Sequence, residues 1–115
     1  MGDSPIIGAG TYARDGVCAV SGTGKGEFFI RHVVGHEIAS RVAYLGEDVK
    51  TAATKVVMED LKPHNIGAGL VAVGADGTIA APYNTDGMFR GWVSDDGEFF
   101  VASHDEVFRY EPRQK

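Results

Sequence analysis

Cysteine is almost absent from this sequence, which contains one, Cys18, in 115 residues. A lone cysteine excludes an internal disulfide, and a reducing compartment is its simplest setting. No apolar run approaches the roughly 20 residues that a helix needs to cross a bilayer. Met1 is followed by Gly-Asp-Ser-Pro, without the basic start and apolar stretch of a secretory signal. We therefore expect a cytoplasmic protein that does not enter a membrane.

Basic charge is also scarce, because the formal net charge is −5 at pH 7. This balance gives no electrostatic footprint for nucleic acid or for an anionic membrane surface. Hydrophobic residues make up 43% of the chain, which argues against wholesale disorder. The length suits one domain or part of one. Glycine, in contrast, is abundant, with 16 residues, and this predicts tight turns and close backbone approaches.

The apolar periodicity predicts a buried strand and then a long helix. Residues 2–13 contain proline and glycine and are predicted as loop, whereas Val17 to Ser21 read as a short buried strand. Glu27 to Leu45 are predicted as one helix that ends at Gly46. Gly35 inside it indicates a close packing contact. The apolar residues that recur every fourth position in this helix are Ile30, Val34, Ile38 and Val42.

A second helix is expected directly after the first, with Asp48 as its N-cap and Pro63 just beyond its end. Its apolar positions fall on one stripe: Val49, Ala52, Ala53, Val56, Val57 and Leu61. The remainder changes to a two-residue period and predicts two hairpins. Their strands are 70–73 with 78–81, and 89–93 with 98–102, while 104–115 is left open between a last strand and a loose tail. This order predicts an α+β fold with two adjacent helices on antiparallel strands.

The segment AVSGTGKGEF at 19–28 superficially resembles a phosphate-binding loop. The Walker pattern fails at both ends, because Ala19 stands at the first glycine position and Gly26 replaces the hydroxyl residue after Lys25. A strand end followed by a glycine turn and a helix start still directs free N–H groups at one spot. Such a spot suits a carboxylate, or an oxygen that becomes negative during acyl transfer. A plain connection between strand and helix is the alternative.

Other candidate residues have simpler interpretations. His32 and His36 lie four apart on one predicted helix face, yet no third ligand is evident, so solvated or core-rim histidines are favoured over a metal site. Cys18 lies in a predicted buried strand and is expected to pack inertly. Glu59 and Asp60 are expected on a solvated helix face. We expect no metal and no cofactor.

Three segments resemble the C-terminal part of the β-subunit of the plant-type asparaginase and isoaspartyl peptidase family. They are GDSPIIGAGTYA at 2–13, SGTGKGEFFIR at 21–31 and APYNTDGMFRGW at 81–92. The helix pair between the last two, including KVVMEDL, also fits this family. The resemblance covers nearly the whole chain, with only the last dozen residues uninformative.

The resemblance implies an N-terminal-nucleophile hydrolase with a four-layer αββα fold, of which residues 1–115 would be a single partial domain. Members of the family cleave themselves. The new N-terminal threonine then attacks the side-chain amide of L-asparagine or a β-aspartyl peptide bond, with its own amine as base. The resemblance assigns Thr23 and Gly24 to the oxyanion hole. Asp3 would hold the α-amino group of the substrate, with Gly24 and the carbonyl of Gly26 beside it.

Two features of the family pattern lie outside these residues. In Gly-Arg-Val-Gly-Asp-Ser-Pro the arginine that grips the α-carboxylate would precede Met1, and the nucleophilic threonine lies further upstream. The expected partners are therefore the α-subunit and the first part of the β-subunit, in an oligomer, and the isolated chain is expected to be inactive. A truncated product, a shifted start codon and half of a split enzyme are open explanations. A non-catalytic remnant or an interaction module is the alternative function.

Overall fold

The computed structural model describes residues 5–94, 96–104 and 106–110. Asp3 therefore lies outside the described residues. The chain divides into two compact units, one up to Asn84 and one from Thr85 onward, and each is described by itself. Within the described ranges, no helix is long and apolar enough to cross a membrane.

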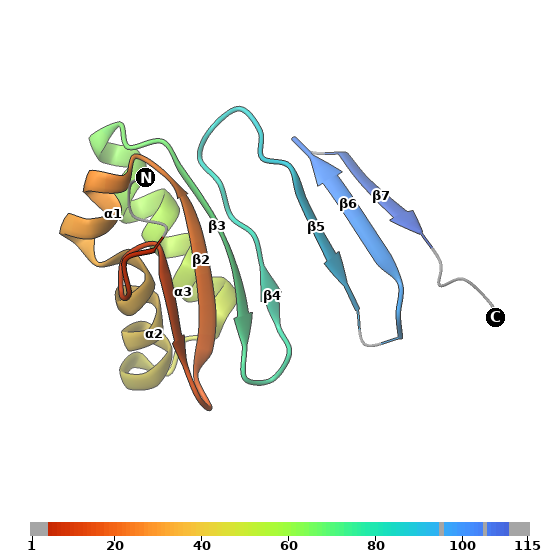
Figure 1. Cartoon of the computed structure of the whole chain (residues 1–115), viewed down its shortest axis with the longest axis horizontal. Coiled ribbons are helices and arrows are strands. Elements are labelled where there is room, and N and C mark those ends of the chain that lie inside the picture. Colours follow the sequence, from red (N-terminus) through yellow and green to blue (C-terminus); the bar gives the residue numbers. More distant parts are fainter. Residues whose placement is uncertain (1–4, 95, 105, 111–115) are drawn as a thin grey trace. The chain divides into compact units, whose positions relative to one another are not determined.

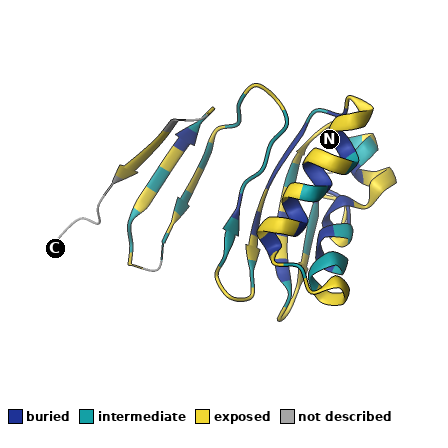
Figure 2. Ribbon diagram, turned by 180° about the vertical axis from the view of Figure 1, so that it is seen from behind, coloured by how far each residue is buried: buried dark blue, intermediate teal, exposed yellow. Residues whose placement is uncertain are grey.

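The first unit is a four-stranded antiparallel sheet with helices on one face (Figures 1 and 2). The strand order is β1-β2-β3-β4. The strands are β1 at Thr11–Arg14, β2 at Cys18–Gly24, β3 at Ala68–Gly74 and β4 at Ile79–Ala80. The helical elements are α1 at Gly26–His32, α2 at Val34–Leu45, α3 at Val49–Lys55, the π-helical turn η1 at Val56–Leu61 and the 3₁₀ turn η2 at Lys62–His64.

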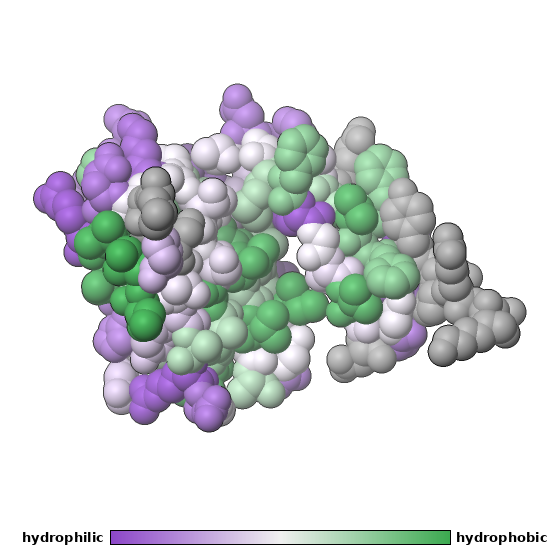
Figure 3. All heavy atoms as spheres, viewed as in Figure 1, coloured by the Kyte–Doolittle hydropathy of each residue, from purple (hydrophilic) through white to green (hydrophobic). Residues whose placement is uncertain are grey.

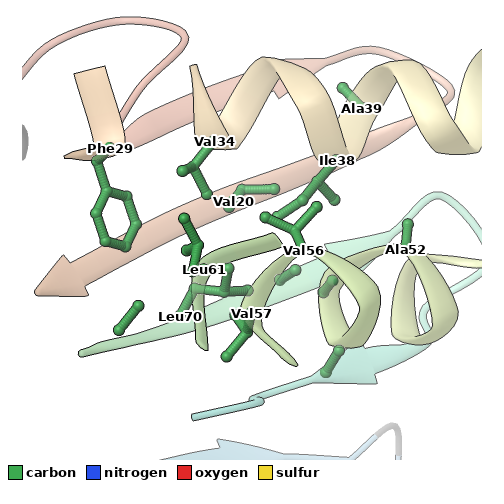
Figure 4. Packing of buried hydrophobic residues seen from close by; sticks show 14 of the residues in the cluster. Val20, Phe29, Val34, Ile38, Ala39, Ala52, Val56, Val57, Leu61 and Leu70 are labelled. Carbon is green, nitrogen blue, oxygen red and sulfur yellow. The ribbon is translucent and has the colours of Figure 1, made fainter. Parts of the chain in front are cut away.

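The core of this unit lies between the helices and the sheet. Figure 4 shows Phe29, Val34 and Ile38 pointing toward side chains from the sheet and from α3 and η1. All six residues of the stripe predicted for the second helix are buried, which confirms that part of the sequence analysis. The buried hydrophobic cluster comprises Ala9, Cys18, Val20, Phe29, Val34, Ile38, Ala39, Val49, Ala52, Ala53, Val56, Val57, Leu61, Ile66, Ala68, Leu70, Ala72 and Ala80.

The long first helix is broken, and the prediction of one helix over 27–45 is wrong at Val33. This residue adopts the left-handed conformation, with φ 44° and ψ 53°, and ends α1 while preceding α2. A β-branched residue is strained there, so the break is maintained by packing on both sides rather than by local propensity. Phe29 of α1 and Val34 of α2 are both fully buried, and the break allows each helix to direct its apolar side chain into the core.

Several local signals are confirmed. Asp48 caps α3, because its Oδ1 accepts from the backbone N–H of Thr51 at 2.6 Å. Gly46 ends α2 with φ 71°. Gly35 packs closely, since a Cβ there would lie 2.8 Å from the Cβ of Tyr12. The predicted loop over 2–13 is wrong at its end, where β1 begins at Thr11 and pairs with β2.

The second unit is a three-stranded antiparallel sheet in the order β5-β6-β7. Its strands are β5 at Arg90–Val93, β6 at Phe99–Ser103 and β7 at Glu106–Tyr110. Trp92 and Phe100 are register partners and stack at 5.1 Å between ring centroids. Both predicted hairpins are confirmed. The sequence left 104–115 open between a last strand and a loose tail, and the structure has a strand there over Glu106–Tyr110. The α+β class with antiparallel strands is thus confirmed.

Candidate functional site

The glycine-rich segment is a strand and not a turn. β2 continues through Gly22, Thr23 and Gly24 and pairs with β3 along its whole length, so only Lys25 separates it from α1. The predicted glycine turn is therefore wrong, although the predicted sequence of strand followed by helix is confirmed. Lys25 makes no side-chain cap hydrogen bond, and α1 is only seven residues long. The strand end itself, rather than a long helix behind it, defines the geometry of this site.

Phe29 explains why glycine occurs twice in this strand end. Its ring is fully buried. A Cβ on Gly22 would lie 2.4 Å from Cε1 of Phe29, and a Cβ on Gly24 would lie 3.0 Å from Cε2. The ring thus packs directly under the backbone of both residues, where no side chain fits. The glycines place the strand against the first turns of α1.

Thr23 lies between these two glycines and points to the other face of the sheet. Successive side chains alternate across a strand, and the neighbouring positions face Phe29. Thr23 is accordingly exposed, as is Ser21 two residues before it. Its register partner on β3 is Gly69, which has no side chain to cover it. The hydroxyl of Thr23 is therefore presented on an open surface beside the backbone of Gly24.

Gly24 has a backbone conformation that other residues rarely adopt, with φ +145°. It is paired with Ala68 at the start of β3. A Cβ on Gly24 would lie 2.5 Å from the carbonyl oxygen of Gly67 and 3.1 Å from the Cα of Ala68. The position is thus restricted to glycine by conformation and by space. Gly26 follows as the first residue of α1 and is partly buried.

Asn84 anchors the segment against which Gly24 packs. Its Oδ1 accepts from the backbone N–H of Ala68 at 2.8 Å, and its Nδ2 donates to the carbonyls of Val57 and Ile66, each at 3.0 Å. The backbone N–H of Asn84 donates to the carbonyl of Ala68 at 3.0 Å. Sequence analysis missed this role, because no local pattern in 81–92 predicts a side chain that bonds to Val57, Ile66 and Ala68. Its position within the third resembling segment was the available signal.

The two histidines predicted to share a helix face do not meet. The break at Val33 places His32 on α1 and His36 on α2. The ring of His36 makes an edge-to-face contact with Tyr12 at 5.4 Å, whereas His32 lies near His64 at 6.5 Å between centroids. Among the described residues, no group of three or more metal-ligating side chains gathers.

Cys18 and the two acidic residues fit their structural interpretations. Cys18 is buried in β2, and burial raises the pKa of its thiol, which disfavours a reactive thiolate. Glu59 is exposed, while Asp60 is partly buried and lies 3.7 Å from the guanidinium of Arg41. These residues need no catalytic role.

Comparison with known proteins defines the class to which this fold and strand end belong. The family model described as asparaginase matches residues 1–102. The chain therefore belongs to the plant-type asparaginase and isoaspartyl peptidase family, as the sequence resemblance indicated.

Individual relatives agree with this assignment. The isoaspartyl peptidase of Escherichia coli (strain K12) is 45% identical over 92 residues, which cover 80% of this chain and 29% of that protein. The probable isoaspartyl peptidase/L-asparaginase 2 of Arabidopsis thaliana is 40% identical over 102 residues, or 89% of this chain and 30% of that protein. The plant-type L-asparaginase of Pyrobaculum calidifontis is 39% identical over 95 residues, with 80% and 31% covered. The chain thus spans about 30% of the length of the relatives that it matches.

Proposed function

We propose that residues 1–115 are part of a hydrolase that acts on the side-chain amide of L-asparagine or on β-aspartyl peptide bonds. The family membership and the names of the relatives support this reaction class. The observation that carries the proposal is the Thr23–Gly24 strand end. It presents a hydroxyl on an open face next to a backbone position that only glycine can occupy.

In this proposal the strand end stabilises charge. Thr23 and Gly24 provide the oxyanion hole for the carbonyl oxygen, which becomes negative when the nucleophile attacks. Preformed donors are effective because they need no reorganisation as the charge develops. The strand pairing to β3 and the ring of Phe29 supply such rigidity here.

Substrate recognition is proposed to use Asp3, Gly24 and Gly26. A carboxylate is a suitable partner for the α-ammonium group, and a nearby carbonyl accepts a further hydrogen bond from it. The nucleophile is proposed to be an N-terminal threonine from a preceding segment, activated by its own amine. The complete protein would adopt the αββα arrangement and include the α-subunit as a partner. This chemistry calls for no cofactor.

The 115-residue chain alone is proposed to be inactive toward both substrates, because oxyanion stabilisation cannot replace a nucleophile. A non-catalytic role, as a remnant or interaction module, is the competing possibility. Turnover of asparagine by the purified chain that disappears in Thr23→Ala would contradict the proposed division of roles.

The proposal is tested in a chimera. The segment of Escherichia coli isoaspartyl peptidase that matches this chain is exchanged for residues 1–115, and self-cleavage and hydrolysis of a β-aspartyl dipeptide and of asparagine are measured. We expect a processed, active enzyme. Asp3→Ala should raise KM, because the contact with the α-ammonium group exists before and during the reaction. A chimera that folds and is processed but hydrolyses neither substrate would contradict the proposal and favour the non-catalytic role.

A further inference from the structure

The amide of Asn84 joins three segments that are separate in sequence. Its three side-chain hydrogen bonds reach Val57 in the π-helical turn η1, Ile66 in the following loop and Ala68 at the start of β3. A neutral carboxamide offers one acceptor oxygen and a two-hydrogen donor group, and all of these functions are used here. The side chain therefore fixes the segment 66–68 from both its carbonyl and its N–H sides.

This fixed segment is the surface on which Gly24 rests. Ala68 is the register partner of Gly24, and the carbonyl of Gly67 approaches the Cα of Gly24 so closely that no Cβ fits between them. A displacement of 66–68 therefore cannot be absorbed by a flexible side chain and is transmitted to the backbone of Gly24. Asn84 reaches Gly24 only indirectly, because it hydrogen-bonds to Ala68 and not to Gly24.

Small displacements at an oxyanion site have large effects on rate. Donors must lie close to the position of the developing charge, and a misplacement of about 1 Å can reduce the rate about 100-fold. A residue that determines where 66–68 lies thus influences the chemical step without touching the substrate.

We propose that Asn84 is a positioning residue, which holds the Gly67–Ala68 backbone so that Gly24 and Thr23 keep the geometry of the oxyanion hole. This inference rests on the proposed function of that strand end. Asn84 also borders a pocket of about 270 Å³, together with Lys62, Asn65, Ile66 and Gly67. Water from this pocket can reach the polar groups that a substitution at Asn84 would release, which favours a shifted segment over an unfolded one.

Asn84→Asp is the discriminating variant, because it keeps the shape and the acceptor toward Ala68 but removes both donors. A carboxylate would then face the carbonyls of Val57 and Ile66. Asn65→Asp is the matched control. It adds the same charge beside the same pocket, at a left-handed position that aspartate tolerates.

In the processed chimera, with active sites titrated, Asn84→Asp should lower kcat at least 10-fold and change KM less than about threefold. Asn65→Asp should leave both within about twofold. An unchanged kcat in Asn84→Asp, or an equal loss of kcat in Asn65→Asp, would overturn the positioning role.

A second measurement separates this inference from the proposed function. An inactive chimera would refute the function, whereas amide hydrogen exchange in the 115-residue chain tests the anchoring alone. In Asn84→Asp, exchange at Thr23 and Gly69, the register pair next to Gly24 and Ala68, should accelerate at least 10-fold relative to Asn65→Asp, while Cys18 and Val20, at the other end of β2, should keep their rates. Equal exchange at Thr23 and Gly69 in the two variants, or acceleration over all of β2, would overturn the inference.

Discussion

At the scale of single residues, the site depends on how the buried ring of Phe29 packs against the backbone of two glycines. Phe29 is fully buried beneath Gly22 and Gly24, and Thr23 between them is turned to the open face. The sequence identified these residues as a candidate oxyanion segment but described them as a turn. Nothing local indicates that Phe29, five positions after Gly24, would fold back under the strand, because this contact requires the helix start to be placed in three dimensions.

Gly22→Ala tests this packing relation directly. The added methyl group would lie 2.4 Å from Cε1 of a ring that is held in the core. Overpacking of this kind destabilises by about 1–3 kcal/mol. We expect a lower midpoint of urea unfolding, followed by circular dichroism at fixed protein concentration, and partial recovery in Gly22→Ala/Phe29→Leu. Ser21→Ala, on the exposed face of the same strand, should change stability by less than about 0.5 kcal/mol. Equal stability of Gly22→Ala and wild type would show that the ring is not fixed there.

At the scale of elements, the sequence predicted most helices and strands but not the break at Val33. Apolar spacing correctly gave the buried stripe of the second helix and the pairing of both hairpins. The spacing around Val33 continues without interruption, and valine is not a residue that favours the left-handed region. Tertiary packing of Phe29 and Val34 overrides the local preference, and such a conflict cannot be read from one segment alone.

Glu47 connects two of these helices and gives the stability a pH dependence. Lys55 Nζ lies 2.6 Å from its carboxylate, and Arg41 lies 3.4 Å away. The hydrogen bond from Lys55, with a further contribution from Arg41, holds the pKa of Glu47 below its ordinary value. A carboxyl group with a depressed folded-state pKa stabilises the fold above the unfolded value of about 4.3, and this contribution is lost as the pH falls through the folded value.

Glu47→Gln should therefore lower stability at pH 7 and reduce the loss of stability on acidification below about pH 4.3. Thermal unfolding between pH 3 and pH 7 measures both effects. Glu59→Gln removes the same charge from an exposed position and serves as the control. A Glu47→Gln curve parallel to that of wild type over this range would contradict the assigned coupling.

At the scale of the whole molecule, each unit leaves apolar sheet surface uncovered. On the sheet face of the first unit opposite the helices, Val71 and Val73 are 43% and 48% exposed, and Figure 3 shows hydrophobic side chains on this side. In the second unit, Phe108 is 52% exposed. We propose that the remaining segments of an αββα domain cover such surfaces in the complete protein, with 1–115 as a portion of that domain.

The isolated chain should consequently self-associate. Exposed apolar faces and unpaired strand edges favour contacts between copies. Sedimentation velocity from about 5 to 200 μM should show an average mass that rises with concentration, and Val71→Lys/Val73→Lys should reduce this rise. A concentration-independent monomer with a sharp thermal transition would instead identify a self-sufficient domain.

The central claim is that the Thr23–Gly24 strand end stabilises the developing oxyanion, and kcat of the processed chimera tests it most directly. Thr23→Ala removes one proposed donor, which should lower kcat about 100- to 1,000-fold, or roughly 3–4 kcal/mol, with a smaller change in KM. Ser21→Ala, on the same exposed face two residues earlier, should keep kcat within about twofold. A correctly processed Thr23→Ala chimera that hydrolyses the β-aspartyl dipeptide with the kcat of the unsubstituted chimera would contradict the account.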